Sequence, residues 1–283
     1  MISKKLINKL FGNRSSLYIK NQVCYSSIEK QNKIKVNNIE INYLKVGNGP
    51  QTLLLLPGAL GSIFTDFKPQ IETLNREKYT IVAWDPPGYG FSRPPDRNYS
   101  PGFFYHDADY AISLMKSLQI NKYSLLGWSD GGITALIMAS KAVDRVEKLI
   151  IWGSNAYVTE KDIELYEKIR DIQNWSPRMK QPFVELYGEK YFSNTWNAWV
   201  DSFQIILKEN GGDICREALP KISAPTLILH GAQDPIVPME HPVYLHKKIK
   251  FGSLKIYPEG KHNIHLRYAE LFNSEVDDFL AKN

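Results

Sequence analysis

The stretch 124–139 has the residue types and order that could turn a serine into a nucleophile. Residues 127–131 read Gly-Trp-Ser-Asp-Gly and fit the pattern G-x-S-x-G. Apolar residues before this pattern predict the end of a buried strand, and apolar residues at helical spacing after it predict a helix. The tight turn between them needs glycine where backbones approach closely, and it raises Ser129 Oγ above the sheet at a helix N-terminus. We therefore interpret Ser129 as a nucleophile and not as an ordinary turn serine.

A serine hydroxyl is a weak nucleophile, so it needs a base within reach and a third group that orients the base. Asp234 lies just past a predicted buried strand at 226–231, and His262 lies between the last predicted strand and the last predicted helix. The order serine, acid, histidine is that of an α/β-hydrolase fold. His265 is a rival base, but we expect it to cap or pack because it falls where the last helix starts. We assign Ser129, Asp234 and His262 as a catalytic triad.

The negative charge that develops on a carbonyl oxygen during attack needs two backbone N–H donors. In this fold one donor belongs to the residue after the nucleophile, here Asp130. The other belongs to the turn after the predicted strand at 52–56, where either Ala59 or Leu60 is the donor. This mechanism needs no cofactor and no metal, and we expect neither. Asp85 closes another predicted strand in a turn rich in proline and glycine, so we interpret it as a structural, turn-capping carboxylate.

The elements that position these residues can be predicted from apolar patterns. Continuous apolar runs are typical of strands buried on both faces, and they occur at 52–56, 79–84, 148–153 and 226–231. Alternating polarity around Asn37-Asn38 predicts an antiparallel edge hairpin over 33–46. A last strand is expected at 254–257, with helices that include 66–76, 102–118 and 266–280. Strands that alternate with helices predict an α/β fold with a mostly parallel central sheet flanked by helices.

Residues 155–220 have a different character. Strand patterns are lacking there, and charged helical segments carry many aromatic residues. We predict a helical lid inserted between two parts of the hydrolase core, 33–154 and 221–283. Aromatic side chains in such a segment form its core more often than a substrate wall, so we assign none of them to ligand binding.

Composition narrows the function classes. The formal net charge is +5, but residues 1–28 hold five basic and no acidic residues, so the rest of the chain is neutral. This balance gives no support for nucleic-acid binding. No apolar run approaches the length of a membrane span. The two cysteines lie far apart without metal-ligand spacing, which favours a reducing compartment.

Residues 1–28 combine apolar residues at helical spacing with lysine, arginine and serine and no acid. This pattern is typical of a mitochondrial presequence and predicts mitochondrial localisation. A disordered basic tail is an alternative, and a surface-binding helix is another, although the segment is short for one.

Several longer motifs resemble the family of biphenyl hydrolase-like serine hydrolases, or valacyclovir hydrolases. They include Leu-Leu-Leu-Pro-Gly, Ala-Trp-Asp-Pro, Arg-Pro-Pro-Asp-Arg, Leu-Leu-Gly-Trp-Ser-Asp-Gly-Gly and Pro-Glu-Gly-Lys-His-Asn. The resemblance runs from about Ile34 to the C-terminus. It implies hydrolysis of small-molecule α-amino-acid esters through an acyl-enzyme, with Asp130 binding the substrate α-amino group. Pro87 replaces an arginine of the family pattern, in a turn whose proline form is widespread among relatives.

Physical arguments support this role of Asp130. A carboxylate at a helix N-terminus is favoured in its ionised form. A substrate ammonium would gain a charge-assisted bond of roughly 1.5–3 kcal/mol. Asp130 could instead only stabilise its helix. The same triad also serves hydrolases of C–C bonds and of lactones or thiolactones, and a ligand-binding protein of low turnover could retain it. The sequence leaves the oligomeric state open.

Overall fold

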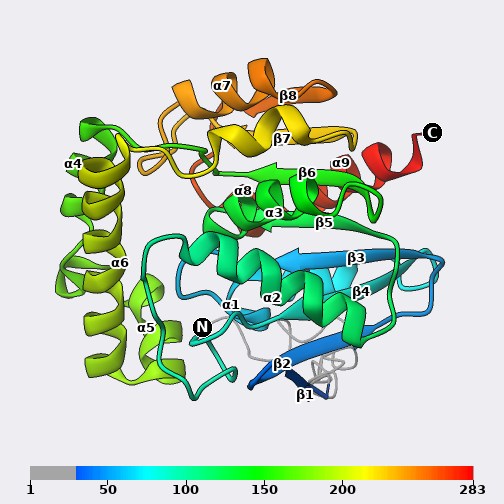
Figure 1. Ribbon diagram of the computed structural model, residues 1–283, viewed down its shortest axis with the longest axis horizontal. Helices are drawn as coiled ribbons and strands as arrows, with labels where there is room; N and C mark the ends of the chain where they lie inside the picture. The colour runs from blue at the N-terminus through cyan, green and yellow to red at the C-terminus, as the bar shows by residue number, and fades with distance from the viewer. Residues whose placement is uncertain (1–29, 283) are drawn as a thin grey trace, which may run out of the picture. The chain divides into compact units, whose positions relative to one another are not determined.

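Eight strands form one sheet in the computed structural model, which describes residues 30–282 (Figure 1). The sheet order is β1-β2-β4-β3-β5-β6-β7-β8. β1 pairs antiparallel with β2, and β2 antiparallel with β4, while the other neighbours run parallel. The predicted edge hairpin and mostly parallel sheet are confirmed, and the predicted presequence lies outside the described residues. The strands are β1 (Asn32–Val36), β2 (Ile39–Val46), β3 (Gln51–Leu56), β4 (Tyr79–Trp84), β5 (Tyr123–Trp128), β6 (Val146–Trp152), β7 (Thr226–Gly231) and β8 (Gly252–Tyr257).

Helices cover both faces of the sheet. The described helices are α1 (Ile63–Thr73), α2 (Phe103–Ser117), α3 (Asp130–Lys141), α4 (Glu160–Lys168), α5 (Pro177–Tyr187), α6 (Glu189–Asn210), α7 (Glu240–Lys248), α8 (Ile264–Arg267) and α9 (Ala269–Ala281), with 3₁₀ turns η2 (Ile172–Asn174) and η3 (Arg216–Lys221). In Figure 1, α2 and α3 lie in front of the sheet and α1 and α9 behind it. No helix among residues 30–282 is long and apolar enough to cross a membrane.

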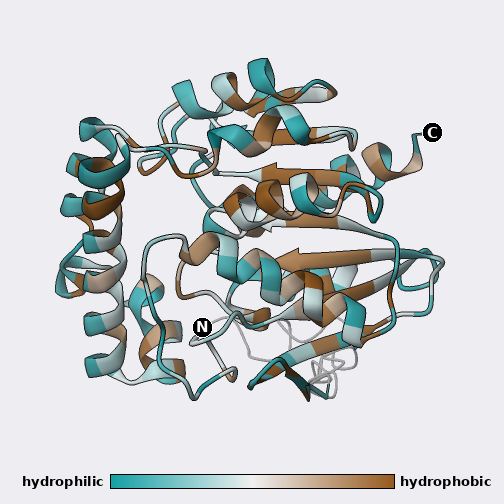
Figure 2. Ribbon diagram, in the orientation of Figure 1, coloured by the Kyte–Doolittle hydropathy of each residue, from teal (hydrophilic) through white to brown (hydrophobic). Residues whose placement is uncertain are grey.

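The central strands divide their side chains between two hydrophobic cores because successive residues of a strand point to opposite faces. Leu54 and Leu56 pack with α2 and α3, whereas Leu53 and Leu55 pack with α1 and α9. Figure 2 shows the sheet strands as the most apolar part of the ribbon. This two-sided burial explains why the strands read as continuous apolar runs in the sequence.

Between β6 and β7 the chain leaves the sheet and forms α4, η2, α5, α6 and η3. Figure 1 shows α4, α5 and α6 beyond the carboxyl ends of the strands. Ser129 follows the carboxyl end of β5. The aromatic side chains of these helices pack closely, and Trp196 and Trp199 stack with ring centroids 4.7 Å apart. These aromatic side chains extend the core that α2 and α3 form with the sheet. The segment therefore packs on the end of the sheet that carries the candidate site.

Two predicted helices differ from the structure. The helix expected at 66–76 spans Ile63–Thr73, because Ser62 and Thr65 form a capping box that starts it three residues earlier. The helix expected at 266–280 is two helices, α8 and α9, which meet at Tyr268. The backbone of Tyr268 is non-helical, with φ −122° and ψ 45°, so the chain changes direction there.

Candidate active site

Ser129 occupies the turn between β5 and α3 in a conformation that serine rarely adopts. Its φ is 54° and its ψ is −121°. A non-glycine residue in this region carries strain of about 1–3 kcal/mol and needs support from its surroundings. Here the Ser129 N–H donates to the Trp152 carbonyl at 2.9 Å, and the Ser154 hydroxyl donates to the Ser129 carbonyl at 3.0 Å. The turn is therefore held in a fixed position at the end of β5.

The glycines on either side of Ser129 permit close backbone approach. A Cβ on Gly131 would lie 2.0 Å from the Leu56 carbonyl oxygen, and one on Gly127 would lie 2.5 Å from the Gly131 oxygen. Any side chain there would push α3 away from β3 and β5. The prediction that this turn requires glycine is confirmed for both positions.

His262 and Asp234 are directly hydrogen bonded. The His262 Nδ1 lies 2.8 Å from Asp234 Oδ2, and the two side chains are 13% and 1% exposed. Asp234 Oδ1 accepts the backbone N–H groups of Ile236 and Val237 at 2.9 and 3.0 Å. Burial opposes ionisation of Asp234, but His262 and these hydrogen bonds outweigh it and lower the pKa of the carboxyl. Asp234 is thus an ionised acceptor that fixes the His262 ring.

The structure brings His262 beside the serine turn without joining the two side chains. Within residues 30–282, no direct hydrogen bond links Ser129 Oγ to the His262 ring. The indole N–H of Trp128 donates to the His262 carbonyl at 3.0 Å, and the two rings lie 5.3 Å apart. The residue before the nucleophile therefore anchors the histidine loop. Catalytic hydrogen bonds are often long in ligand-free enzymes and tighten when substrate binds.

His265 is a core residue, as predicted. Its side chain is fully buried; Nδ1 accepts from the Trp152 indole and Nε2 donates to the Asp66 carbonyl, each at 2.9 Å. Burial lowers the pKa of His265 to about 3, so the ring stays neutral. Both nitrogens are occupied, which leaves neither free to accept a proton from Ser129.

Asp85 also has the structural role predicted from the sequence. The buried carboxylate accepts the N–H groups of Ile63 and Phe91 at 2.9 and 2.8 Å and the Asn42 amide at 2.8 Å. It thereby joins the start of α1 to the turn after β4.

The loop that should supply the second oxyanion donor lies against the nucleophile. A Cβ on Gly58 would be 3.3 Å from Ser129 Cβ. Leu60 has a left-handed φ of 53°. Asp66 supports this loop, because its Oδ2 accepts the Gly58 N–H at 2.8 Å. In the described part of the chain, the N–H groups of Ala59, Leu60 and Asp130 have no acceptor, so all three stay available to an oxyanion.

Asp130 is buried, although it is the first residue of helix α3. It is 7% exposed, and its Oδ2 accepts the indole N–H of Trp199, from α6 of the segment predicted to be a lid, at 2.8 Å. Burial raises the pKa of Asp130 to about 7, against the opposing effects of Trp199 and Arg97. The expectation that the helix N-terminus would favour ionisation was therefore wrong, since desolvation outweighs the helix dipole.

Arg97, which borders the same space as Asp130, is paired with another carboxylate. Arg97 makes a two-pronged ion pair with Asp107, at 2.8 and 2.6 Å, and its side chain is 3% exposed. Among residues 30–282 no basic side chain forms an ion pair with Asp130. When Asp130 ionises, its charge is therefore left for a ligand to balance.

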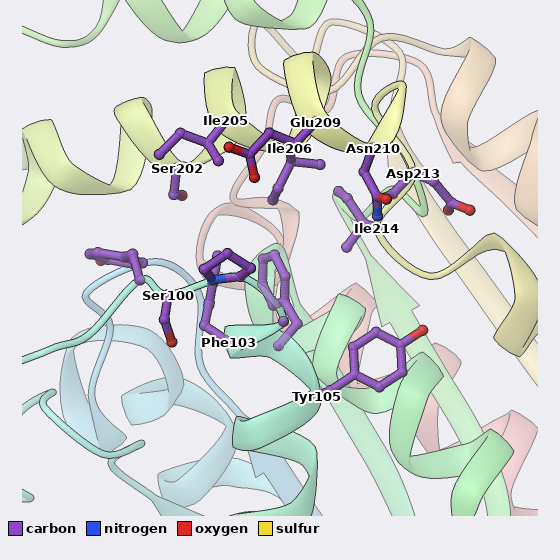
Figure 3. A pocket seen from close by; sticks show the side chains of 14 residues that line it. Ser100, Phe103, Tyr105, Ser202, Ile205, Ile206, Glu209, Asn210, Asp213 and Ile214 are labelled. Carbon is purple, nitrogen blue, oxygen red and sulfur yellow. The ribbon is translucent and has the colours of Figure 1, made fainter.

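The space beside Asp130 is small. It amounts to about 10 Å³ and is bordered by Tyr89, Arg97 and Asp130, which is room for about one water molecule. A larger cavity of about 290 Å³ lies between α2 and α6, and Figure 3 shows Ile206 and Glu209 facing Phe103 across it. None of the predicted site residues lines that cavity. Asp130 is therefore covered by its neighbours, whereas Ser129 and His262 are partly exposed.

One group in the described residues could hold a metal ion, namely Asp162, Glu240 and His241. Asp162 already has other partners. Asp162 Oδ2 accepts both the N–H and the hydroxyl of Thr159, and Oδ1 lies 2.9 Å from His241 Nε2. These bonds cap α4 and fasten it to α7, and that structural role accounts for the group.

Sequence reasoning missed Trp199, Arg97 and Trp128 as neighbours of the candidate site. Trp199 lies 69 residues from its partner Asp130, and no periodicity relates the two. Arg97 belongs to a motif that carried the family resemblance, which was the one signal available for it. Trp128 is the variable position of G-x-S-x-G, so the pattern itself assigns it no role.

A parallel sheet, a strained serine turn and an adjoining histidine–aspartate pair define an α/β hydrolase, and this chain belongs to that family. The alpha/beta hydrolase fold family matches residues 51–186. Serine hydrolase BPHL of Homo sapiens is 50% identical over 248 residues, covering 88% of this chain and 85% of the relative, and the Mus musculus protein gives the same values. The resemblance to biphenyl hydrolase-like enzymes is confirmed, and the chain is a serine hydrolase. A meta-cleavage product hydrolase from Pseudomonas fluorescens IP01 shares the fold, with a TM-score of 0.74 and 22% identity over 88% of this chain and 97% of that one.

Proposed function

We propose that this serine hydrolase cleaves small α-amino-acid esters through an acyl-enzyme. The observation that carries the proposal is Asp130, a buried carboxylate directly after Ser129 whose charge no described side chain pairs. The likeness to serine hydrolase BPHL, over most of both chains, supports a shared reaction class.

In the acylation step, Ser129 Oγ attacks the ester carbonyl carbon while His262 Nε2 takes the hydroxyl proton. Asp234 holds Nδ1–H at 2.8 Å, which leaves the lone pair on Nε2 to act as the base. The N–H groups of Asp130 and of Ala59 or Leu60 stabilise the oxyanion. The tetrahedral intermediate collapses, the C–O bond to the alcohol breaks, and His262 returns its proton to the departing alcohol.

In deacylation, water attacks the acyl carbon with His262 again as the base. The second intermediate releases the amino acid, and Ser129 recovers its proton. Trp128 contributes by holding the His262 carbonyl, so the ring stays in place through both steps.

The ammonium group of the substrate is the partner that the Asp130 carboxylate lacks. Burial of Asp130 makes its ionised form costly, and an ammonium beside it offsets that cost while excluding water. A neutral acyl group at the same place would leave the carboxyl to protonate. Asp130 would therefore select esters with a free α-amino group.

Asp130→Asn tests this selectivity. Asparagine retains the backbone N–H, the volume and an acceptor for Trp199, but it removes the negative charge. We expect kcat/KM for free aminoacyl esters to fall by about one to two orders of magnitude, which matches loss of a charged contact of roughly 1.5–3 kcal/mol. Esters without the amino group, or with the amino group acylated, should react nearly as before. Asp109→Asn, which removes an exposed charge from α2, should change neither rate.

The pH dependence of kcat/KM tests the contact between Asp130 and the substrate ammonium independently. We take the ratio of kcat/KM for an aminoacyl ester to kcat/KM for its des-amino analogue. Enzyme ionisations that affect both reactions alike, such as that of the base, cancel in this ratio. Asp130 is ionised above its pKa of about 7, and the substrate ammonium loses its proton near ~8. The ratio should therefore peak between these values and fall on both sides, and the acid limb should vanish in Asp130→Asn. If Asp130→Asn lowered kcat/KM equally for the aminoacyl ester and its des-amino analogue, Asp130 would only support the turn and would not bind the amino group.

The fold also serves other chemistry, as the meta-cleavage product hydrolase illustrates, so substrate class has to be measured. Faster cleavage of C–C bonds or lactones than of any aminoacyl ester would replace our proposal. Rapid labelling by a fluorophosphonate without turnover of any of these substrates would indicate a ligand-binding role.

We also propose that residues 1–28 direct the chain to mitochondria, from their basic, acid-free, amphipathic composition. These residues fused to a reporter should carry it into mitochondria. A reporter that stays wholly in the cytosol would refute the proposal.

A further inference from the structure

Tyr187, the last residue of α5, makes two hydrogen bonds to loops of the hydrolase core. Its hydroxyl donates to the Leu60 carbonyl at 2.8 Å and accepts the Gly90 N–H at 2.7 Å. The side chain is buried, and burial raises the pKa of the Tyr187 hydroxyl well above its ordinary value. It is therefore a neutral donor at every working pH. A lid helix thus holds the loop that lies beside Ser129.

Leu60 needs such support. Its left-handed φ of 53° is strained for a side chain branched at Cγ. Asp66 fixes the start of the loop through the Gly58 N–H, and Gly61 N–H donates to the Gly58 carbonyl at 3.0 Å. Neither bond involves the Leu60 carbonyl. Tyr187 supplies that contact, so the loop is held by α1 on one side and by the lid on the other.

We propose that Tyr187 is a positioning residue that aligns the oxyanion donor of the 59–60 loop when the lid is closed. The proposal rests on the oxyanion role that the proposed function gives this loop. A carbonyl held in place limits rotation of the Leu60 backbone, which also directs its own N–H and the adjoining peptide. The Tyr187 bond exists only while α5 stays packed against the core, as it is in this structure. Loss of that packing would release the Leu60 carbonyl and the donor with it.

Tyr191 provides a matched control in the same lid. Its hydroxyl donates to the Gly88 carbonyl at 3.1 Å and accepts the Arg97 N–H at 3.0 Å. Its ring stacks on Tyr187 with centroids 5.7 Å apart. Both tyrosines therefore fasten the segment by one donated and one accepted bond, but the Tyr191 hydroxyl bonds to Gly88 and Arg97 and not to the 59–60 loop.

The test compares Tyr187→Phe with Tyr191→Phe on a des-amino ester, so that it does not depend on amino-group recognition. We expect Tyr187→Phe to lower kcat by about 10- to 100-fold with little change in KM, because complete loss of an oxyanion donor costs on the order of 10²–10³. Affinity for a trifluoromethyl ketone, which forms an oxyanion adduct with Ser129, should fall by the same factor. Tyr191→Phe should leave both values within about threefold.

Equal losses in the two variants would overturn the proposal, and so would a loss of kcat without loss of affinity for the ketone. p-Aminophenylalanine at position 187 retains a donor for Leu60 and nearly the same volume, and it should restore most of kcat. If Tyr187→Phe fails to fold, the p-aminophenylalanine variant tests the proposal by itself. Losses above tenfold in both its kcat and its affinity for the ketone would contradict the proposal. Equal wild-type rates on aminoacyl and des-amino esters would refute amino-acid selectivity and leave this comparison intact.

Discussion

Ser129→Ala and His262→Ala are each expected to abolish nearly all ester hydrolysis, with the double variant hardly slower than either single one. The serine and its base act as one unit, because the hydroxyl attacks effectively only when a base takes its proton. Removal of either therefore forfeits the same step, and the losses do not add. In a serine protease such losses are on the order of 10⁶ in kcat.

Rates on a simple ester and labelling by a fluorophosphonate measure this directly. Wild type should be labelled at Ser129, Ser129→Ala not at all, and His262→Ala far more slowly. His265→Ala serves as the comparison for the base. It should destabilise the fold, since it empties a core position and leaves the Trp152 indole unpaired. A folded His265→Ala that is inactive, beside an active His262→Ala, would show that the base is His265.

Features carried by a short stretch of chain could be predicted from sequence. The turn at Ser129 is one of these, because strand, glycines and helix are contiguous, and backbone clearance at Gly131 then determines the geometry. Asp85 and His265 were interpreted correctly for a related reason. Their places at the end of a strand and the start of a helix indicate local structural roles, which the hydrogen bonds of both side chains bear out.

Features that depend on the lid could not be predicted in this way. The protonation of Asp130 was predicted in the wrong direction, because the helix N-terminus is visible in the sequence whereas burial beneath Trp199 is not. Similarly, Tyr187 reaches Leu60 across 127 residues. A packed aromatic segment was expected there, but the sequence cannot indicate which of its hydroxyls faces the core. Burial by residues distant in the sequence therefore explains both the wrong direction predicted for the Asp130 pKa and the failure to identify Tyr187.

Asp234→Asn is expected to lower kcat on esters by about four orders of magnitude without unfolding the protein. Asp234 Oδ1 accepts two backbone N–H groups, from Ile236 and Val237. In the variant these donors hold the amide oxygen in that place, so the amide nitrogen must face His262. A donor facing Nδ1 forces the ring proton onto Nε2, and the lone pair that should take the Ser129 proton is lost.

The measurement is kcat on a simple ester, with thermal unfolding to verify the fold and Ser129→Ala to set the background rate. Asp234→Ala is the informative companion. It removes the wrongly oriented donor together with the acid, so His262 can regain its productive tautomer in part. We therefore expect Asp234→Ala to be no slower than Asp234→Asn, although alanine leaves the two backbone N–H groups unpaired and costs more stability. A loss below about tenfold in Asp234→Asn would contradict its role as the orienting acid, because a buried carboxylate 2.8 Å from the base could then be replaced without consequence.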